Sequence, residues 1–329
     1  MRRLLRRAAL AIALLALLAL GIGWIVGTSA ARASRVGGAV ARTARGPVEY
    51  ARRLPHRAPE QSHAVLLVHG TPGGFGQVLP LAERLAEEGL DSIVFSRPGY
   101  LGTPLSVGRT FAEQADAAMA LLDCLRIDTA AVVGISGGGP VALQIALRHP
   151  QRTTGLAMIA AVTFEEPGVA AAVAANPPGW RADLTSLAAS FLPDLALRLC
   201  GVADPRERSR RAADPRLRSR LRTLFRSLAV SGLTNAGYQN DYRQAGADNP
   251  ADYAIERIQA PTLAIYGDLD SVVPAAHGER LTQKIADARL VVMPGRHAFF
   301  ILDEGAMLER LVPFLRKVAR RSRASTPRR

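Results

Sequence analysis

A serine lies between glycines in the segment Gly134-Ile135-Ser136-Gly137-Gly138. An apolar run at residues 130–133 predicts a buried strand before this segment, and a stretch with helical spacing begins at Pro140. On a sharp turn from strand to helix, glycines two residues from the serine remove side chains that would collide with it. The alternative is a glycine-rich turn with an incidental serine. The strand before the turn and the helix after it favour Ser136 as a nucleophile.

Two backbone N–H groups are candidates for the oxyanion hole that such a nucleophile needs. The N–H of Gly137 would lie at a helix N-terminus, where peptide dipoles favour the negative charge of a tetrahedral intermediate. A second glycine-rich turn, His69-Gly70-Thr71-Pro72-Gly73-Gly74, directly follows an apolar run at residues 64–68. Because its glycines let the backbone approach a substrate closely, the N–H of Thr71 is the second candidate. His69 precedes the turn, and we expect it to be a hydrogen-bonded structural histidine rather than a catalytic base.

Short apolar runs and helical stretches alternate along most of the chain. The runs are continuous rather than alternating, which is typical of strands buried on both faces of a parallel sheet: residues 64–68, 92–95, 130–133, 156–161, 262–266 and 290–293. Helical apolar spacing is found between and after them, at residues 79–88, 110–125, 140–148, 276–285 and 304–318. The pattern predicts an α/β fold with a mostly parallel, doubly wound sheet.

The alternation stops between residues 163 and 257, which are rich in Ala, Leu and Arg. Two helix starts are marked there by Asp204-Pro205 and Asp214-Pro215, since aspartate caps free N–H groups and proline fits the first helical position. We therefore predict a helical cap at 163–257, inserted into a core made of 46–162 and 258–318. We expect the substrate to reach Ser136 under this cap, through a largely apolar pocket. The apolar side chains of the cap, most of them expected in its own core, are Trp180, Phe191, Leu195, Leu199, Leu224, Phe225 and Leu228.

The amino-terminal region predicts a membrane segment. Residues 8–31 carry no charge and are long enough to span a bilayer, whereas a signal-peptide core is shorter. The arginines before them favour a cytoplasmic start of the chain, which places the rest outside the cytoplasm. We therefore predict a signal anchor at 1–31. Small residues at Ser29 and Ala31 leave signal cleavage and secretion as the alternative. Residues 32–45, rich in Ala, Gly and Arg, are a predicted linker.

The net charge of +14 comes mainly from the two ends of the chain. The first seven residues carry four arginines, and the last fourteen carry seven basic residues, with no acid in either segment. The 308 residues between them have a net charge of only +3, so no nucleic-acid face is required. Residues 319–329 are predicted to be a basic, disordered tail. The two lysines, Lys284 and Lys317, do not form the Gly-Lys-Ser/Thr of a P-loop, which excludes that class of nucleotide site.

The order of the His-Gly turn, the serine elbow, a late aspartate and a last histidine resembles the α/β-hydrolase superfamily, over about residues 60–318. The segment Arg97-Pro98-Gly99-Tyr100 is also similar to a loop of that family. Ser96 stands where the family usually has an aspartate, a departure that affects bracing of this loop more than chemistry.

The resemblance implies the other two members of a catalytic triad. The family pattern G-x-x-D-x-x-V-P places the acid at Asp270, with Asp268 as the runner-up. Glu165 lies where some relatives keep their acid instead. The base is expected after the last strand, where the sequence has His297. His297 would take the proton of Ser136, and the carboxylate would fix the histidine tautomer and stabilise the imidazolium.

The activity implied is that of a serine hydrolase that cleaves small to medium carboxylic esters through an acyl-enzyme, with no cofactor and no metal. Serine argues against the relatives that attack haloalkanes or epoxides with an aspartate. The partners expected are a small-molecule ester and, through the amino-terminal segment, a membrane. One alternative is an aminopeptidase similar to proline iminopeptidases, which typically bind an ammonium with lid carboxylates. The cap is rich in arginine around 206–226, which places this alternative second. The other alternative is a catalytically silent binding protein on the same scaffold.

Overall fold

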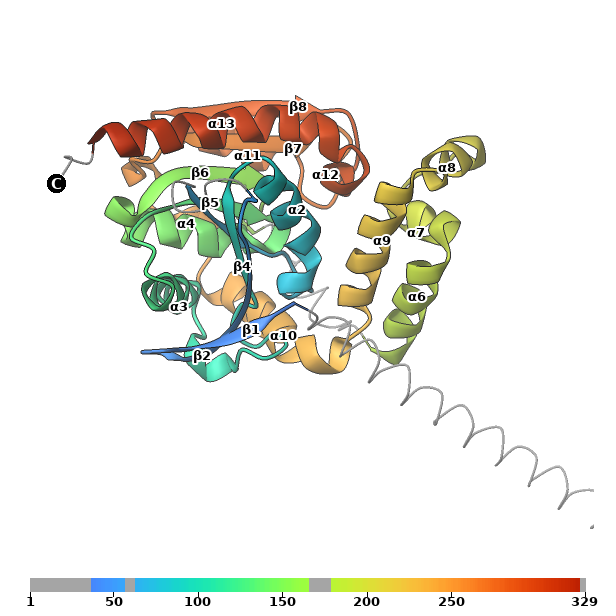
Figure 1. Cartoon of the computed structure of the whole chain (residues 1–329), viewed down its shortest axis with the longest axis horizontal. Helices are drawn as coiled ribbons and strands as arrows, with labels where there is room; N and C mark the ends of the chain where they lie inside the picture. The colour runs from blue at the N-terminus through green and yellow to red at the C-terminus, as the bar shows by residue number, and fades with distance from the viewer. Residues whose placement is uncertain (1–36, 57–62, 166–178, 326–329) are drawn as a thin grey trace, which may run out of the picture.

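A computed structural model of the chain describes residues 37–56, 63–165 and 179–325 (Figure 1). In this part of the chain, eight strands form one sheet in the order β1-β2-β4-β3-β5-β6-β7-β8. β2 is antiparallel to β1 and β4, and every other neighbouring pair is parallel, as predicted for an α/β fold. The strands are β1 (Ala39–Thr43), β2 (Gly46–Arg53), β3 (Ala64–Val68), β4 (Asp91–Phe95), β5 (Ala130–Ile135), β6 (Thr153–Ile159), β7 (Thr262–Gly267) and β8 (Ala288–Met293).

Helices cover both faces of the sheet. α2 (Phe75–Glu87) and α13 (Glu304–Ser325) pack on one face, and α3 (Phe111–Cys124), α4 (Gly139–Arg148) and α11 (Ala276–Lys284) pack on the other (Figure 1). All five residues of β3 are buried because its alternate side chains enter the two cores: Leu66 and Val68 pack with α3 and α4, while Val65 and Leu67 pack with α2 and α13. Continuous apolar strands follow from this double covering.

The strand order places the site. β3 pairs with β4 on one side and with β5 on the other, so the direction of chain progression reverses at β3. In open α/β sheets, ligands bind at such a switch point, beyond the carboxyl ends of the strands. The turn after β3 carries Thr71 and the turn after β5 carries Ser136. These two turns are therefore brought together by the sheet itself.

The cap insertion divides into two parts. Helices α6 (Trp180–Phe191), α7 (Pro193–Leu199), α8 (Pro205–Ala212) and α9 (Pro215–Leu228) pack around a small core of their own beside the sheet (Figure 1). The aspartate side chains of Asp204 and Asp214 cap α8 and α9, which confirms both predicted starts. Helix α10 (Ser231–Ala247) contacts α6 at its first residue and lies against the loop that follows β4.

Two predictions about the ends of the chain are wrong in detail. The predicted linker at 32–45 contains strand β1, which pairs with β2 through the turn before Gly46; it lacks an apolar run because it is an edge strand. The predicted disordered tail at 319–329 is helical as far as Ser325, because α13 continues past Val318 and Ala319, both buried.

The predicted membrane segment at 1–31 lies outside the described residues. Within the ranges that the structure describes, no helix combines the length and the apolar character that crossing a bilayer requires.

Candidate active site

Ser136 occupies a strained turn between β5 and α4. Its φ angle of 50° lies in the left-handed region, where non-glycine residues are rare. Its neighbours must be glycine for steric reasons. A Cβ on Gly134 would lie 2.6 Å from the Cβ of Ala142, and one on Gly138 would lie 2.5 Å from the carbonyl oxygen of Val68. The G-x-S-x-G pattern thus forms the sharp elbow that the sequence predicts.

The structure brings Ser136, His297 and Asp270 together from the ends of three strands. The Oγ of Ser136 lies 3.0 Å from the Nε2 of His297. The Nδ1 of the same ring lies 2.8 Å from the Oδ2 of Asp270. His297 lies beyond the end of β8 and Asp270 beyond the end of the adjacent β7. The arrangement is a continuous hydrogen-bonded chain from hydroxyl to carboxylate, in which Nδ1–H donates to Asp270 and Nε2 can accept from Ser136.

Asp270 is held as a buried, ionised carboxylate. It is 5% exposed, and its Oδ1 accepts hydrogen bonds of 2.9 Å from the backbone N–H groups of Val272 and Val273. Burial acts to raise the pKa of Asp270, but the hydrogen bond from His297 and the two backbone N–H groups outweigh it and lower the pKa below its usual value. The carboxylate therefore stays charged where an imidazolium would form beside it.

The other two candidate acids occupy different positions. Asp268 accepts a hydrogen bond of 2.8 Å from the backbone N–H of Gly295 and so stabilises the turn that precedes His297. Glu165 lies at the pocket, where its own backbone N–H donates to the side chain of Asn249. The carboxylate that contacts the ring of His297 is that of Asp270.

The two candidate oxyanion donors lie against each other. A Cβ on Gly137 would be 3.1 Å from the backbone nitrogen of Thr71 and 2.8 Å from its Cβ. A Cβ on Gly70 would be 2.9 Å from the Cβ of Ser136. Any side chain at Gly137 or Gly70 would push the Thr71 turn away from the elbow. Glycine at both places lets Thr71 and Gly137 lie close together, and both line the same pocket as Ser136.

His69 has the structural role expected for it. The side chain is fully buried, its Nδ1–H donates to the carbonyl oxygen of Gly70 (2.7 Å), and its Nε2 accepts from the backbone N–H of Arg97 (3.0 Å). Burial, with the positive charge of Arg97 nearby, lowers the pKa of His69 well below its usual value. A neutral ring thus joins the Thr71 turn to the loop after β4.

The loop after β4 is braced by a carboxylate from another strand. Ser96, which replaces the usual aspartate, donates a hydrogen bond of 3.0 Å to Glu49 of β2. The same Glu49 oxygen accepts from the backbone N–H of Gly102, 2.9 Å away. Glu49 thereby supplies, from a neighbouring strand, the carboxylate that an aspartate at position 96 supplies in most relatives.

A pocket of about 300 Å³ opens beside Ser136. Its apolar lining residues include Phe111, Pro140, Val162 and Val273. Its polar lining residues include Asp241, Tyr242 and Glu165. His277 also lines the pocket; its ring stacks on Phe164 with centroids 3.8 Å apart, and burial lowers its pKa to about 4. Most of the exposed lining is apolar, in agreement with the predicted largely apolar pocket, although the carboxylates of Asp241 and Glu165 also line it.

The apolar cap residues named from the sequence do not line this pocket. Leu224 and Phe225 are buried in the separate core of α6–α9, with Leu195 and Leu228 packed on it, whereas Trp180, Phe191 and Leu199 are exposed. Among the cap helices that the structure describes, only α10 borders the pocket, through Asp241, Tyr242 and Ala245. The reason is that the leucine-rich helices pack on one another and on α2 and α12 (Phe299–Leu302), whereas the polar helix α10 packs on the loop after β4, next to the pocket.

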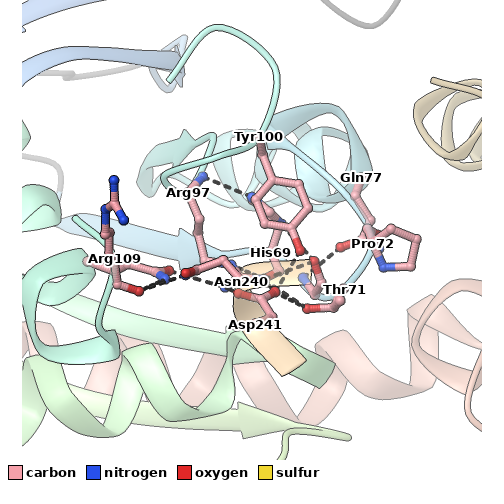
Figure 2. A network of polar contacts seen from close by, with 11 residues as sticks. His69, Thr71, Pro72, Gln77, Arg97, Tyr100, Arg109, Asn240 and Asp241 are labelled. Carbon is pink, nitrogen blue, oxygen red and sulfur yellow. Dashed lines mark hydrogen bonds and ion pairs between the residues drawn. The ribbon is translucent and has the colours of Figure 1, made fainter. Parts of the chain in front are cut away.

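Sequence reasoning missed Asp241. Its carboxylate accepts hydrogen bonds from Arg97 and Tyr100 of the loop after β4, and from Thr71 (Figure 2). The family resemblance drew attention to Arg97 and Tyr100, but Asp241 lies in a polar stretch, Asn240-Asp241-Tyr242-Arg243, without a recognisable motif. Asp241 is only 6% exposed, and its partner Arg97 is fully buried. Only the tertiary structure reveals this burial.

No group of three or more His, Cys, Asp or Glu side chains suited to hold a metal occurs among the described residues.

Comparison with known proteins gives the following matches. A family model for the alpha/beta hydrolase fold matches residues 63–304. The solved structure of an alpha/beta hydrolase fold protein from Nakamurella multipartita has a TM-score of 0.69 and is 33% identical, over 85% of this chain and 99% of that one.

Two curated relatives align over most of their length. A poly(3-hydroxyalkanoate) depolymerase of Ectopseudomonas oleovorans is 27% identical over 82% of this chain and 88% of the relative. A pimeloyl-[acyl-carrier protein] methyl ester esterase of Neisseria meningitidis is 29% identical over 74% of this chain and 90% of the relative. A shorter match, 38% identical over 81 residues, spans 28% of the uncharacterized hydrolase YcgS of Bacillus subtilis.

Proposed function

Because this chain belongs to the α/β-hydrolase family, we propose that it is a serine hydrolase that cleaves small to medium carboxylic esters through an acyl-enzyme. The chain is an enzyme of that family, since its relatives are esterases and other hydrolases. The observation that carries the proposal is the hydrogen-bonded chain from the Oγ of Ser136 through His297 to Asp270. Serine, a base and an orienting carboxylate at these distances are the requirements for nucleophilic catalysis.

Acylation follows from this geometry. The Nε2 of His297 takes the proton of Ser136 as its Oγ attacks the ester carbonyl carbon. The carbonyl oxygen becomes an oxyanion, which the N–H groups of Thr71 and Gly137 stabilise. As the intermediate collapses, the bond to the alcohol oxygen breaks and the imidazolium returns its proton to that oxygen. Asp270 stabilises the positive charge on the ring during these steps.

Deacylation repeats the sequence with water. His297 accepts a proton from the water molecule that attacks the acyl-enzyme, and it then gives that proton to the Oγ of Ser136 as the acid leaves. Every proton that the mechanism moves is carried by His297, so the mechanism needs no further titrating group.

The size and lining of the pocket support the substrate class. A volume of about 300 Å³ lies at the small end of the usual range for ligand pockets, which suits a small to medium acyl group. Its apolar lining residues, which include Val162 and Val273, suit a hydrocarbon chain. The carboxylate of Asp241 is already bound by Arg97, Tyr100 and Thr71, so it is a poor site for a substrate ammonium. The hydrogen bonds that already occupy Asp241 favour an ester substrate over a peptide with a charged amino terminus. The aminopeptidase therefore stays the second candidate.

A chain-length series tests the substrate class. We expect kcat/KM for p-nitrophenyl esters to rise from acetate to butyrate, because each methylene that fits the apolar lining adds up to about 1 kcal/mol of transition-state binding. Beyond the limit of the pocket, kcat/KM should fall. The measurement is initial rates of p-nitrophenol release by the full chain.

Proline p-nitroanilide serves as the comparison substrate. A higher kcat/KM for this anilide than for every ester would reject the esterase and promote the aminopeptidase. Absence of turnover with all of these substrates would favour the silent binding protein.

The amino-terminal segment leads to a proposal about location. We propose that residues 1–31 anchor the enzyme in a membrane with the catalytic domain outside the cytoplasm. The support is the uncharged run at 8–31, which follows a cluster of arginines.

Fractionation of cells that express the full chain tests the anchor. We expect the protein to stay in the membrane pellet after a high-salt wash and to be released by detergent, because an apolar span is held by the hydrophobic effect and not by charge. The control is a chain that lacks residues 1–31 but keeps strand β1. We expect this shorter chain in the soluble fraction. A product that begins at Ala31, Arg32 or Ser34 and is found in the medium would show cleavage and secretion instead.

A further inference from the structure

The carboxylate of Asp241 reaches from the cap to the turn that carries the proposed oxyanion donor Thr71. Asp241 lies on α10, and its Oδ2 accepts hydrogen bonds from the hydroxyl of Tyr100 (2.6 Å), from the guanidinium of Arg97 (2.6 Å) and from the Oγ1 of Thr71 (Figure 2). Its Oδ1 accepts a second bond from Arg97, 2.8 Å away. A segment about 170 residues further along the chain thus contacts the Thr71 turn.

The guanidinium of Arg97 links Asp241 to Thr71 and to the backbone before the Thr71 turn. Arg97 is fully buried and donates to Asp241 through both terminal nitrogens, to the carbonyl oxygen of His69 (3.1 Å) and to Gln114 (3.2 Å). It also donates to the Oγ1 of Thr71, 3.0 Å away. The buried pair is therefore fully hydrogen-bonded, which is the condition under which buried charges are tolerated.

These contacts fix the Thr71 side chain from two directions. The Oγ1 of Thr71 donates to Asp241 and accepts from Arg97, so its position is defined by both members of the ion pair. Threonine is branched at Cβ, and fixing Oγ1 selects one χ1 rotamer and restricts the adjoining backbone. The N–H of Thr71, next to Gly137, is thereby held in one direction before a substrate arrives, which is how an oxyanion hole avoids reorganisation.

Helix α10 is also held on the core by contacts that do not involve Asp241. The backbone N–H of Gly237 donates to Gly99 (2.9 Å), and that of Leu101 donates to Leu233 (2.9 Å). The side chain of Asn240 donates to the carbonyl oxygen of Arg109 (2.7 Å; Figure 2). Because these bonds dock the helix, the carboxylate of Asp241 is available for a role beyond docking.

Resting on the proposed hydrolase function, we propose that Asp241 is a positioning residue of the cap that, together with Arg97, aims the N–H of Thr71 at the oxyanion. The cap thus contributes to the chemical step through the oxyanion hole, in addition to lining the pocket.

Asp241→Asn tests this assignment. The variant keeps the shape of the side chain but loses the negative charge that pairs with Arg97. It also replaces one of the two oxygens that accept from Arg97, Tyr100 and Thr71 with an NH2 group, which can only donate. We expect kcat for a p-nitrophenyl ester to fall by about 10- to 100-fold, somewhat less than the loss caused by deleting an oxyanion donor, while KM changes little. The decisive readout compares each ester with its thionoester, whose sulfur accepts hydrogen bonds poorly. The preference for the oxygen ester should fall along with kcat.

A control variant separates aiming of Thr71 from loosening of the cap. Asp183 of α6 accepts hydrogen bonds from the backbone N–H (3.0 Å) and hydroxyl (2.7 Å) of Ser231, the first residue of α10. Asp183→Asn weakens this anchor of α10 without touching Thr71. It should leave kcat and the preference for oxygen over sulfur near the wild-type values.

A second variant covers the case in which Asp241→Asn does not fold. Thr71→Val keeps the backbone N–H and removes only the hydroxyl that Asp241 and Arg97 hold, so it should lower kcat and the oxygen preference in the same direction. An unchanged oxygen preference in the folded variants, or equal losses for Asp183→Asn, would overturn the assignment. Wild-type turnover that Ser136→Ala does not reduce would instead reject the proposed function, which keeps the two failures distinct.

Discussion

Alanine at Ser136 is expected to lower kcat for ester hydrolysis by about 10³-fold or more, and alanine at His297 is expected to do the same. Ser136→Ala removes the atom that attacks the carbonyl carbon. His297→Ala leaves the hydroxyl without the base that lies 3.0 Å from it. Because each residue depends on the other, the double variant should lose little more than either single variant. Steady-state rates with p-nitrophenyl butyrate measure these losses.

A fluorophosphonate probe gives an independent readout of the same chemistry. It should label the wild-type chain at Ser136 and fail to label Ser136→Ala, since only an activated serine attacks phosphorus readily. Circular dichroism shows whether each variant is folded. Turnover near the wild-type rate by either folded variant would reject this mechanism. A folded wild-type chain without labelling would favour the silent scaffold.

Asparagine at Asp270 is expected to lower kcat by about 10³- to 10⁴-fold. The carboxylate accepts from the Nδ1–H of His297 at 2.8 Å and so leaves Nε2 free to accept the proton of Ser136. An amide can donate to Nδ1 instead, which favours the tautomer that carries its proton on Nε2. That ring cannot act as a base. The measurement is kcat at a pH where the wild-type rate is maximal.

Asp268→Asn is the matched comparison, two residues away in the same turn. The side chain of Asp268 accepts a hydrogen bond from the backbone N–H of Gly295. Asparagine keeps an oxygen that can accept this bond. We expect Asp268→Asn to retain most of its activity. A larger loss at Asp268 than at Asp270 would move the acid of the triad by two residues.

The core strands were predictable because burial on both faces leaves a mark in the sequence. Runs such as 64–68 are apolar at every position, and each of the six predicted runs overlaps a strand of the sheet. Strand β1 could not be found in this way, since an edge strand with exposed side chains has no such pattern. The last turns of α13 were missed because their arginines resemble a solvated tail, although Val318 and Ala319 pack on the core.

Local sequence determined the parts of the site that depend on local geometry. The glycines around Ser136 and beside Thr71 are required because other atoms lie within a few ångströms of them. The aspartates at the N-termini of α8 and α9 accept hydrogen bonds from free N–H groups in the first turn of each helix. Such constraints act within a few residues or between adjacent strands. A sequence pattern can therefore show them before any tertiary contact is known.

Tertiary structure alone decided which cap residues reach the site. Nothing near Asp241 in the chain predicts that its carboxylate meets Arg97 and Thr71, because these partners are more than 140 residues away. The apolar residues of α6–α9 had the stronger signal, yet they pack together or face solvent, and the polar helix α10 docks on the core. Hydrophobic periodicity indicates that a helix will bury one face. The docking of whole elements determines what that face meets, and here it placed a buried ion pair at the proposed oxyanion hole.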